Sequence, residues 1–325
     1  MAAAHDFLEI INNFNSLNII IIGDIMLDRY VNGSVSRQSP EAPVPVLLKG
    51  DESIMPGGAA NLAMNLAGLT VQTTLMGRCG QDQNARTLNH SLAQQENLQT
   101  YLTADDTCPT ITKTRFLNEG THLLRLDEEK PFEDDNHFND AVLKTLENQA
   151  YDAIILSDYC KGTLNDALIQ TIIKTAQKNK RPVYGDTKTK DLTAYQNIDG
   201  LTPNRQELEK FCGHAVHNND EDITKAARAL IKCHQIKSLL VTRSQAGASF
   251  ITKNDAVHGA QKKRAVRDVS GAGDATLAGF LAARLCQATA AQALILANII
   301  GGYCAEHDGT TKITKEILEQ EINAW

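Results

Sequence analysis

The sequence predicts an α/β protein in which helices cover both faces of a mostly parallel sheet. Four short apolar runs are typical of buried parallel strands: residues 17–23, 153–157, 182–185 and 238–242. Helical patterns, such as residues 164–178 and 221–233, lie between these runs. Strands that alternate with helices form right-handed βαβ units, and such units build a parallel sheet.

Two segments break this alternation and predict a small β-sheet that stands off the main one. Residues 30–49 contain three prolines and alternating valines, which suits exposed or edge strands. Residues 110–127 are typical of a β-hairpin with its turn near Asn118-Glu119-Gly120. We expect these pieces, about residues 29–52 and 99–127, to form a lid that excludes water from the strand ends. A dimerisation sheet is the alternative use, and the two uses are compatible.

Length and composition favour one domain. The chain has 325 residues without an internal repeat, a low-complexity segment or a linker, so we expect a single domain over residues 1–325. The net charge of -7 argues against a nucleic-acid partner. No apolar run approaches the ~20 residues of a membrane span, and the N-terminal stretch has early acidic residues and no positive n-region. These features indicate a cytoplasmic protein without a membrane partner.

The spacing of cysteine and histidine argues against a metal site on these residues. The seven cysteines are scattered and never spaced C-x-x-C, and the nine histidines show no H-E-x-x-H pattern. We therefore expect neither a disulfide framework nor His or Cys ligands to a metal.

Polar residues follow the predicted strands at the sheet edge where ligands of open α/β sheets bind. These residues are Asp24, Asp28, Asp158, Asp186 and the pair Arg243-Ser244. A carboxylate just past a strand is also often a helix cap, so position alone does not distinguish the two uses.

The stretch 268–274, Asp-Val-Ser-Gly-Ala-Gly-Asp, predicts an anion-binding turn. It lies between an extended segment, 262–269, and an apolar helical run, 275–285. Its small residues bring the backbone close to a ligand, and the following helix would point free N–H groups into the site. A carboxylate there, Asp274, makes chemical sense if it takes a proton from a hydroxyl that attacks a phosphate. The alternative is a glycine-rich turn in which Asp274 is an ordinary cap.

A second glycine-rich stretch, 55–69, predicts a loop that leads into a helix. Gly57 and Gly58 allow close approach of the backbone, and the helix opens near Asn61 with leucines at helical spacing. The Asn61 amide offers a donor and an acceptor to a sugar hydroxyl. Its alternative role is to cap the helix.

Together, residues 57–61 (GGAAN) and 268–274 (DVSGAGD) resemble the two signatures of the PfkB, or ribokinase-like, carbohydrate kinase family. Further segments are similar to the kinase part of bacterial heptose kinase/adenylyltransferases: residues 23–30, 36–46, 109–113, 125–127, 156–162 and 201–204. The resemblance implies a ribokinase-like three-layer α/β/α sandwich with a mostly parallel sheet and a small β-sheet lid. It also implies ATP-dependent phosphorylation of D-glycero-D-manno-heptose 7-phosphate at C1, on the route to ADP-heptose for lipopolysaccharide.

The resemblance further implies roles for individual residues on the sugar side. Asp274 would be the general base, and the N–H groups of Gly271, Ala272 and Gly273 would stabilise charge on the transferring phosphate. The substrate would contact Asp28, Arg37, Gly57, Gly58, Asn61, Lys113, Arg125, Asp158 and Lys161. For the phosphate that the substrate already carries, Lys113 and Arg37 are favoured over other basic residues such as Arg115 and Lys188.

On the nucleotide side, the resemblance implies that ATP contacts Asn204, Glu207, Thr242, Arg243, Ser244, Gly247 and Asn298. Asn204 and Glu207 match the family's N-x-x-E, which acts on Mg²⁺ indirectly and positions phosphate. Taken without the family, N-x-x-E is a frequent start of a solvated helix, and Asn298 could equally bond between helices. Some relatives bind a monovalent cation, for which Asp268 and Ser270 would be the candidate residues.

The sequence departs from the family pattern at several positions. Ala275 stands where threonine usually follows the base, and Thr187 and Thr189 occupy a segment that is commonly Asp-Pro-Lys-Gly. Neither departure removes a proposed catalytic group. The adenylyltransferase motif H-x-G-H does not occur in the sequence, so we expect nucleotidyl transfer to need a separate protein. The exposed edges of a lid, together with the resemblance, indicate a homodimer.

Other functions are weighed against these motifs. A kinase of the same family could act on another sugar or on a nucleoside, which substrate profiling would reveal. A non-catalytic sensor is disfavoured because it would not need the base together with the glycine turn and the N-x-x-E residues. A nicotinamide dehydrogenase is excluded because no G-x-G-x-x-G follows the first predicted strand, where Gly23-Asp24-Ile25 stands instead.

Overall fold

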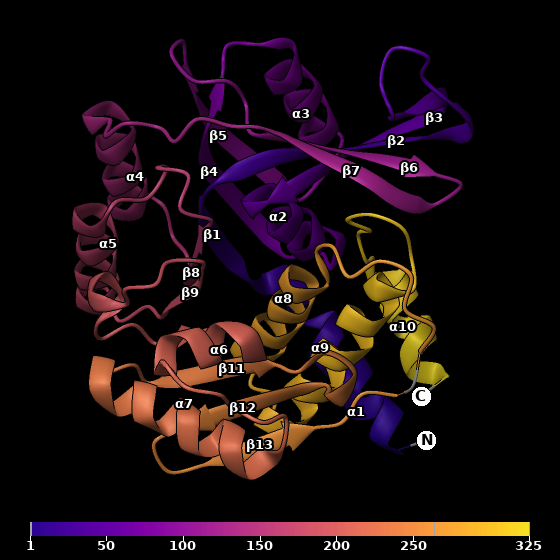
Figure 1. Cartoon of the computed structure of the whole chain (residues 1–325). Coiled ribbons are helices and arrows are strands. Elements are labelled where there is room, and N and C mark those ends of the chain that lie inside the picture. Colours follow the sequence, from indigo (N-terminus) through magenta and orange to yellow (C-terminus); the bar gives the residue numbers. More distant parts are fainter. Residues whose placement is uncertain (1, 263, 325) are drawn as a thin grey trace.

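The computed structural model describes residues 2–262 and 264–324, which form two sheets of very different size (Figure 1). The larger sheet has nine strands in the order β13-β12-β11-β10-β9-β8-β1-β4-β5. In chain order, these strands are β1 (Asn18–Gly23), β4 (Gln72–Gly80), β5 (Leu98–Asp105), β8 (Ala153–Asp158), β9 (Val183–Thr187), β10 (Gly200–Leu201), β11 (Ser238–Thr242), β12 (Ala248–Thr252) and β13 (Ala256–Gly259). The strands pair in parallel, except that β12 and β13 are antiparallel to their neighbours. The α/β class predicted from the sequence is confirmed.

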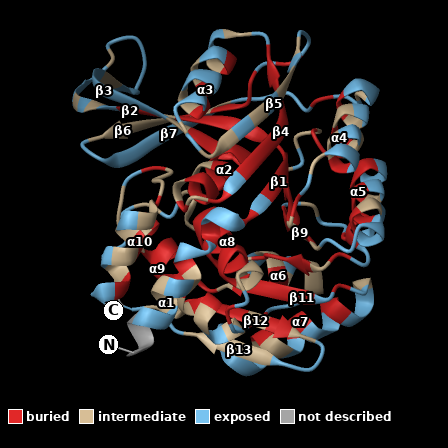
Figure 2. Ribbon diagram, turned by 180° about the vertical axis from the view of Figure 1, so that it is seen from behind, coloured by how far each residue is buried: buried red, intermediate tan, exposed pale blue. Residues whose placement is uncertain are grey.

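Helices cover both faces of this sheet because its central strands are apolar on both sides. In β1, Ile19 and Ile21 join one hydrophobic cluster, whereas Ile20 and Ile22 join the other. The first cluster is completed by α1 (Ala2–Asn12), α2 (Ala59–Gly68), α3 (Gln83–Ala93), α8 (Ala272–Leu285), α9 (Ala290–Ala305) and α10 (Lys315–Asn323). The second is completed by α4 (Asn136–Asn148), α5 (Asp166–Lys178), α6 (Arg205–Cys212) and α7 (Asp220–His234). The result is the expected three-layer sandwich, whose central strands are buried (Figure 2).

The smaller sheet, called the lid here, has four strands in the order β3-β2-β6-β7. They are β2 (Ile25–Gln38), β3 (Pro45–Gly58), β6 (Thr112–Asn118) and β7 (Thr121–Glu128). The hairpin turn lies where predicted, since Glu119 and Gly120 both have positive φ. The lid extends to one side of the molecule (Figure 1). Apart from the buried N-terminal half of β2, most of its residues are exposed (Figure 2).

One expected boundary of the lid is wrong. Residues 99–105, which belong to the expected lid segment 99–127, form part of β5 at the edge of the main sheet. The reason is packing: β5 pairs in parallel with β4, and Leu98 and Leu102 pack against the first hydrophobic cluster. The second piece of the lid is therefore Thr112–Glu128.

The segment before α8 also differs from expectation. Of the extended segment 262–269, Lys263 lies outside the described residues, and the remaining residues form no strand. The helix itself begins at Ala272, one turn earlier than the apolar run indicated, so Asp274 lies in its first turn. Among the described residues, none of the helices combines the length and the apolar character that a membrane crossing requires.

The order of strands locates the ligand-binding edge. From β1, the chain builds the sheet in one direction through β4 and β5, and later in the other direction through β8, β9, β10 and β11. Ligands of open α/β sheets bind at the carboxyl ends of the strands beside such a reversal. Asp24 follows β1 and Asp158 ends β8 at this point.

Candidate active site

Asp274 lies buried in the first turn of α8, with a donor on each carboxylate oxygen. Asn61 Nδ2 of α2 donates to Oδ2 at 2.8 Å, and the Tyr159 hydroxyl donates to Oδ1 at 3.4 Å. Asn61 is itself oriented by Asn65, whose Nδ2 donates to the Asn61 side-chain oxygen at 3.1 Å. That bond leaves the Asn61 amide nitrogen facing the carboxylate. The structure thus joins the two glycine-rich motifs through Asn61 and Asp274.

The turn before α8 requires glycine at position 271. Gly271 has a φ of 74°, and a Cβ there would lie 2.5 Å from Asn61 Nδ2. The N–H groups of Gly271, Ala272 and Gly273, expected as donors to a phosphate, differ in their hydrogen bonding. The Ala272 N–H donates to the Val269 carbonyl at 3.2 Å, so it is already engaged. Gly273 is in the first turn, where a helix leaves its N–H groups without partners inside the helix.

The pKa of Asp274 is raised from 3.8 to about 7, chiefly by burial and next by the charge of Asp186. The hydrogen bond from Asn61 acts in the opposite direction. A general base is most effective when its pKa is near the working pH, so this carboxylate suits proton abstraction at neutral pH. Asp274 is not the cap of α8, because the N-cap position is Gly271 and Asp274 lies within the first turn.

A second charged group, formed by Asp186, Lys188 and Glu207, lies beside the base. Lys188 Nζ is 3.0 Å from Asp186 and 2.8 Å from Glu207. Burial lowers the pKa of Lys188, but the two carboxylates raise it overall. Glu207 also closes a capping box with Asn204, because its carboxylate accepts the Asn204 N–H at 2.9 Å. The N-x-x-E pair therefore caps α6 and faces a lysine at the same time.

On the sugar side, Asp28 lies where the lid meets the main sheet. Its carboxylate pairs with Arg115 of β6 at 2.5 Å, and a Cβ on Gly57 would fall 2.2 Å from Oδ2. The Arg115 guanidinium lies 4.9 Å from the centre of the Tyr30 ring. Gly58 has a φ of 57°, which allows the chain to turn into α2. The first lid strand and the double glycine therefore form one wall.

The basic residues proposed for the substrate fall into two groups. Lys113 and Lys161 both pair with Glu129, at 3.6 and 2.6 Å, so the structure brings together residues from β6 and from the loop after β8. Arg125 is exposed and pairs with Asp127. Arg37 is exposed and follows Asp28 by nine residues along β2, roughly 30 Å at the usual strand rise. Within this chain, Arg37 is not brought to the base.

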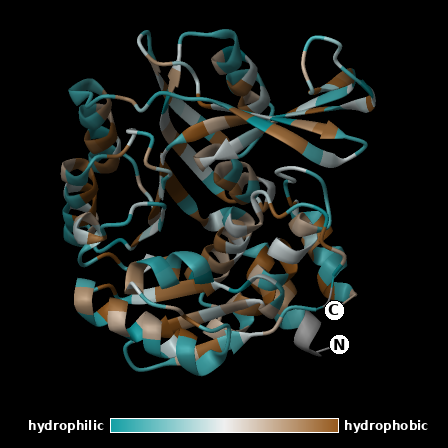
Figure 3. Cartoon of the chain, viewed as in Figure 1, coloured by the Kyte–Doolittle hydropathy of each residue, from teal (hydrophilic) through white to brown (hydrophobic). Residues whose placement is uncertain are grey.

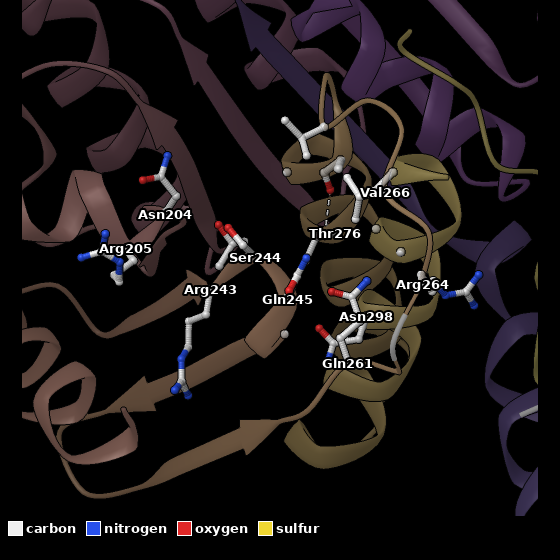
Figure 4. Close-up of a pocket in the computed structure, with 18 of the residues that line it drawn as sticks. Asn204, Arg205, Arg243, Ser244, Gln245, Gln261, Arg264, Val266, Thr276 and Asn298 are labelled. Atoms are coloured by element: carbon white, nitrogen blue, oxygen red, sulfur yellow. Dashed lines mark hydrogen bonds between the residues drawn. The ribbon is translucent and has the colours of Figure 1, made fainter. Parts of the chain in front are cut away.

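A pocket of ≈ 730 Å³ opens beside the N-terminus of α8. Its lining includes most of the residues proposed for ATP: Asn204, Thr242, Arg243, Ser244, Gly247 and Asn298, together with Ala272 and Gly273. Figure 4 shows Asn204 and Ser244 on one side of the pocket and Gln261 and Asn298 on the other. Glu207 is not part of the lining, although its partner Asn204 is.

Two proposed ATP ligands have their side chains committed elsewhere. The Arg243 guanidinium is buried and bonds to Asn218, Asp220 and Ser249, and its side chain runs away from the pocket centre (Figure 4). Asn298 Nδ2 donates to the Gly259 carbonyl at 2.9 Å, which ties α9 to the end of β13. The alternative role, a bond between two helices, is not what the structure shows, because Asn298 bonds to a strand.

Two further acidic candidates hold loops. The Asp158 carboxylate accepts bonds from the Cys160 N–H, the Thr187 hydroxyl and the Tyr195 hydroxyl. The Asp268 carboxylate accepts from the Ser270 N–H at 2.9 Å and from the Gly309 N–H at 3.0 Å. Both arrangements fix backbone next to the site.

Tyr159 was missed by the sequence reasoning as a functional residue, although it lies within the segment 156–162 that carried the resemblance. The signal available was its position directly after β8, at the sheet edge where polar side chains collect. Its contact with Asp274, 115 residues away in the chain, is a tertiary feature that spacing cannot reveal.

A buried carboxylate of raised pKa in the first turn of a helix, next to a pocket of ≈ 730 Å³, suits the transfer of a phosphate to a hydroxyl. The chain belongs to the pfkB family of carbohydrate kinases, whose family model matches residues 16–317. Kinases of this family use ATP as the phosphate donor, in agreement with the nucleotide-side prediction.

Curated relatives agree with this assignment. The "Bifunctional protein HldE" of Actinobacillus pleuropneumoniae serotype 5b (strain L20) is 40% identical over 314 residues, which cover 95% of this chain and 64% of that protein. The protein of the same name from Methylobacillus flagellatus is 39% identical over 311 residues, covering 94% of this chain and 63% of that protein. The chain thus spans less than two thirds of the length of these relatives.

Solved structures show the same fold. Phosphofructokinase-2 from Escherichia coli, in complex with potassium, superposes with a TM-score of 0.79 at 17% identity, covering 95% of this chain and 98% of that one. Ribokinase from Arabidopsis thaliana, complexed with ribose and ATP, gives a TM-score of 0.73 at 19% identity, covering 94% and 98%. The predicted ribokinase-like fold is confirmed.

Proposed function

We propose that this kinase phosphorylates D-glycero-D-manno-heptose 7-phosphate at C1, giving heptose 1,7-bisphosphate on the route to ADP-heptose. The observation that carries the proposal is the position of Asp274 between the ATP-side pocket and the wall formed by Asp28 and Gly57. The choice of sugar is supported by the segments that resemble heptose kinases and by ~40% identity to the HldE proteins. A cytoplasmic location is part of the same proposal, because the donor is ATP.

In the proposed reaction, Asp274 accepts the proton of the C1 hydroxyl as that oxygen attacks the γ-phosphorus of ATP. A P–O bond forms to the sugar, and the P–O bond to the departing ADP breaks. The N-terminus of α8, with Gly271 and Gly273, faces the negative charge of the transferring group. The pKa of Asp274 near 7 allows the base to be ionised before the reaction and protonated after it.

The sugar would lie between the double glycine and the lid. Asp28 would accept bonds from sugar hydroxyls, and Asn61 would keep the base oriented. Lys113 and Lys161, which share Glu129 in this structure, would take the phosphate that the substrate already carries. Binding there would replace the Glu129 carboxylate by the phosphate as the partner of the two lysines.

Mg²⁺ fits the nucleotide side through Glu207 and water. Mg²⁺ keeps several waters and uses one or two carboxylates together with substrate phosphates, and the carboxylates of Asp186 and Glu207 lie beside the base. When bound, the ion would neutralise charge on the ATP phosphates. A monovalent cation near Asp268 and Ser270 is part of the proposal by resemblance alone.

The proposal also includes a homodimer formed through the lid. Among the residues that the structure describes, most of the exposed large apolar side chains lie on the lid strands or on the loop between β2 and β3: Val44, Leu48, Ile54, Leu123, Leu124 and Leu126. Figure 3 shows hydrophobic stretches along its strands. A two-fold interface would cover this surface.

An ATP-consumption assay across a panel of acceptors tests the assignment. The panel contains the seven-carbon 7-phosphate, the free heptose, fructose 6-phosphate, ribose and adenosine, each with Mg²⁺. We expect kcat/KM to be highest for the heptose phosphate, and Asp274→Asn to lower kcat by about 100-fold or more without changing ATP affinity. A strong preference for a free sugar or a nucleoside would reassign the substrate, and near-normal turnover of Asp274→Asn would refute the mechanism.

A further inference from the structure

Tyr159 reaches the base from the loop that follows β8. Its hydroxyl donates to Asp274 Oδ1 at 3.4 Å, on the side of the carboxylate opposite to the Asn61 amide. The bond is longer than the usual 2.7–2.8 Å of an O–H···O bond, and such contacts often tighten only when substrate is bound. The two donors together fix the plane of the carboxylate.

The loop that carries Tyr159 is held in place by one buried carboxylate. Asp24, which is 0% exposed, accepts the backbone N–H groups of Tyr159 at 2.8 Å, Lys161 at 3.0 Å and Thr163 at 3.1 Å. Three N–H donors to a buried carboxylate leave little freedom for the loop. The position of the Tyr159 hydroxyl is therefore set by the end of β1 and not by the loop alone.

The surroundings keep the Tyr159 hydroxyl protonated. Its ring packs against a cluster that includes Met26 and Phe132, and Lys188 Nζ lies 5.5 Å from the ring centre. Burial, followed by the charges of Asp274, Asp186 and Asp28, raises the pKa of the phenol well above its usual value. A phenol that does not ionise can only donate to a neighbouring carboxylate.

The charged and titratable groups around Asp274 come from several elements. Asp186 and Lys188 approach from the end of β9, Tyr159 from the loop after β8, and Cys304 from α9. Of these groups, only Tyr159 donates a hydrogen bond to Oδ1 in this structure. This statement covers the residues 2–262 and 264–324 that the structure describes.

We propose that Tyr159 is a positioning residue for the catalytic base: its hydroxyl holds Asp274 Oδ1 toward the sugar hydroxyl while Asn61 holds Oδ2. The inference rests on the proposed role of Asp274 as the base. It adds a second residue that orients the Asp274 carboxylate, besides Asn61. Asp24 acts one step further back, through the backbone of the Tyr159 loop.

The test compares Tyr159→Phe with Tyr195→Phe in kinetics. Both tyrosines donate to a carboxylate, but the Tyr195 hydroxyl donates to Asp158, at 2.6 Å. With any acceptor that the wild-type enzyme phosphorylates, we expect Tyr159→Phe to lower kcat on the order of 10- to 100-fold with little change in the KM for ATP. Its acid limb of kcat/KM should move to higher pH, because a donor that favours the ionised base is lost. Tyr195→Phe should leave that limb in place.

A second variant and a second readout guard against misfolding. Asp24→Asn removes an acceptor from the loop and should move the acid limb in the same direction as Tyr159→Phe. Urea unfolding of Tyr159→Phe, Asp274→Asn and the double variant at pH 8 should show non-additive changes in the free energy of unfolding, since the phenol stabilises the ionised Asp274. An unmoved acid limb in Tyr159→Phe, or additive changes in the cycle, would overturn the inference. Absence of kinase activity in the wild type would instead refute the proposed function, and the unfolding cycle would still decide the contact.

Discussion

Asp274 lies in a place that is unfavourable for its own charge. Burial and the charge of Asp186 raise the pKa of this group more than the bond from Asn61 lowers it. In the folded protein, the pKa of Asp274 is therefore about 7. In the unfolded chain, the same group would have a pKa near 3.8. Its folded pKa is raised, so its contribution to stability is fully present below the unfolded value and is lost as pH rises through the folded value.

This shift predicts the effect of Asp274→Asn on stability. The variant cannot ionise, so it should be more stable than the wild type at neutral pH. The gain should grow between about pH 4 and pH 7 and then level off, reaching on the order of 4 kcal/mol if the full shift is expressed. Urea unfolding of both proteins at several pH values measures the difference. A gap that shrinks as pH rises would contradict the direction of the shift.

Single residues also show where reasoning from sequence stops. Asp274 and the glycine turn could be singled out from the sequence because a carboxylate lies in a turn whose small residues and free N–H groups would bind an anionic ligand. Arg243 follows a strand at the correct edge, yet its guanidinium is consumed by Asn218, Asp220 and Ser249. Whether a side chain turns into a pocket or away from it depends on partners that are distant in the sequence. The spacing of motifs in the sequence does not reveal these partners.

At the scale of elements, the turn before α8 is the most sensitive. Gly271→Ala should destabilise the protein by about 1–3 kcal/mol, because alanine is strained at positive φ and its Cβ would push Asn61 away from Asp274. Gly273→Ala is the matched control: a Cβ at Gly273 meets nothing within 4 Å. The control should be neutral or stabilising by up to about 1 kcal/mol. Chemical denaturation compares the two variants, and equal losses would show that the turn is not the constraint.

The elements themselves were predictable to different degrees. The central strands were found because apolar runs buried on both faces leave an unmistakable pattern, as in β1 and β8. Residues of β5 were assigned to the lid because their sequence pattern resembles that of an exposed strand. The structure agrees that β5 is only partly buried, although it belongs to the main sheet. β12 and β13 were not expected, because they are short antiparallel edge strands without a helix between them. The alternation of strands and helices therefore does not reveal them. Edge strands take their identity from the neighbour that they pair with.

At the scale of the whole molecule, the lid gives the clearest test of assembly. Leu124 and Leu126 lie on one face of β7 and are 61% and 48% exposed. If a dimer covers this face, Leu124→Lys together with Leu126→Lys should convert the protein to monomers, because two charges would be buried without partners. Light scattering after size-exclusion chromatography reports the mass.

The control for assembly is Tyr101→Lys, which replaces an exposed apolar residue on β5, outside the lid. It should leave the mass unchanged. A double lysine variant that keeps the mass of the wild type, or a monomeric wild type, would refute the lid interface. A small sheet beside the main one was expected from the sequence, but the path of its strands away from Asp274 was not. Arg37 shows the consequence, since a residue can belong to the right strand and still lie far along it.

Asp24 lies at the junction between the main sheet and the lid. Its backbone carbonyl accepts the N–H of Ala59, and its side chain holds the Tyr159 loop, so the two segments that carry the donors to Asp274 are anchored at the end of β1. The lid begins one residue later, at Ile25, and contributes the cations Lys113 and Arg115. On the proposed assignment, exchanging the lid residues of β6 would alter the accepted sugar while Asp274 and its two donors stay in place.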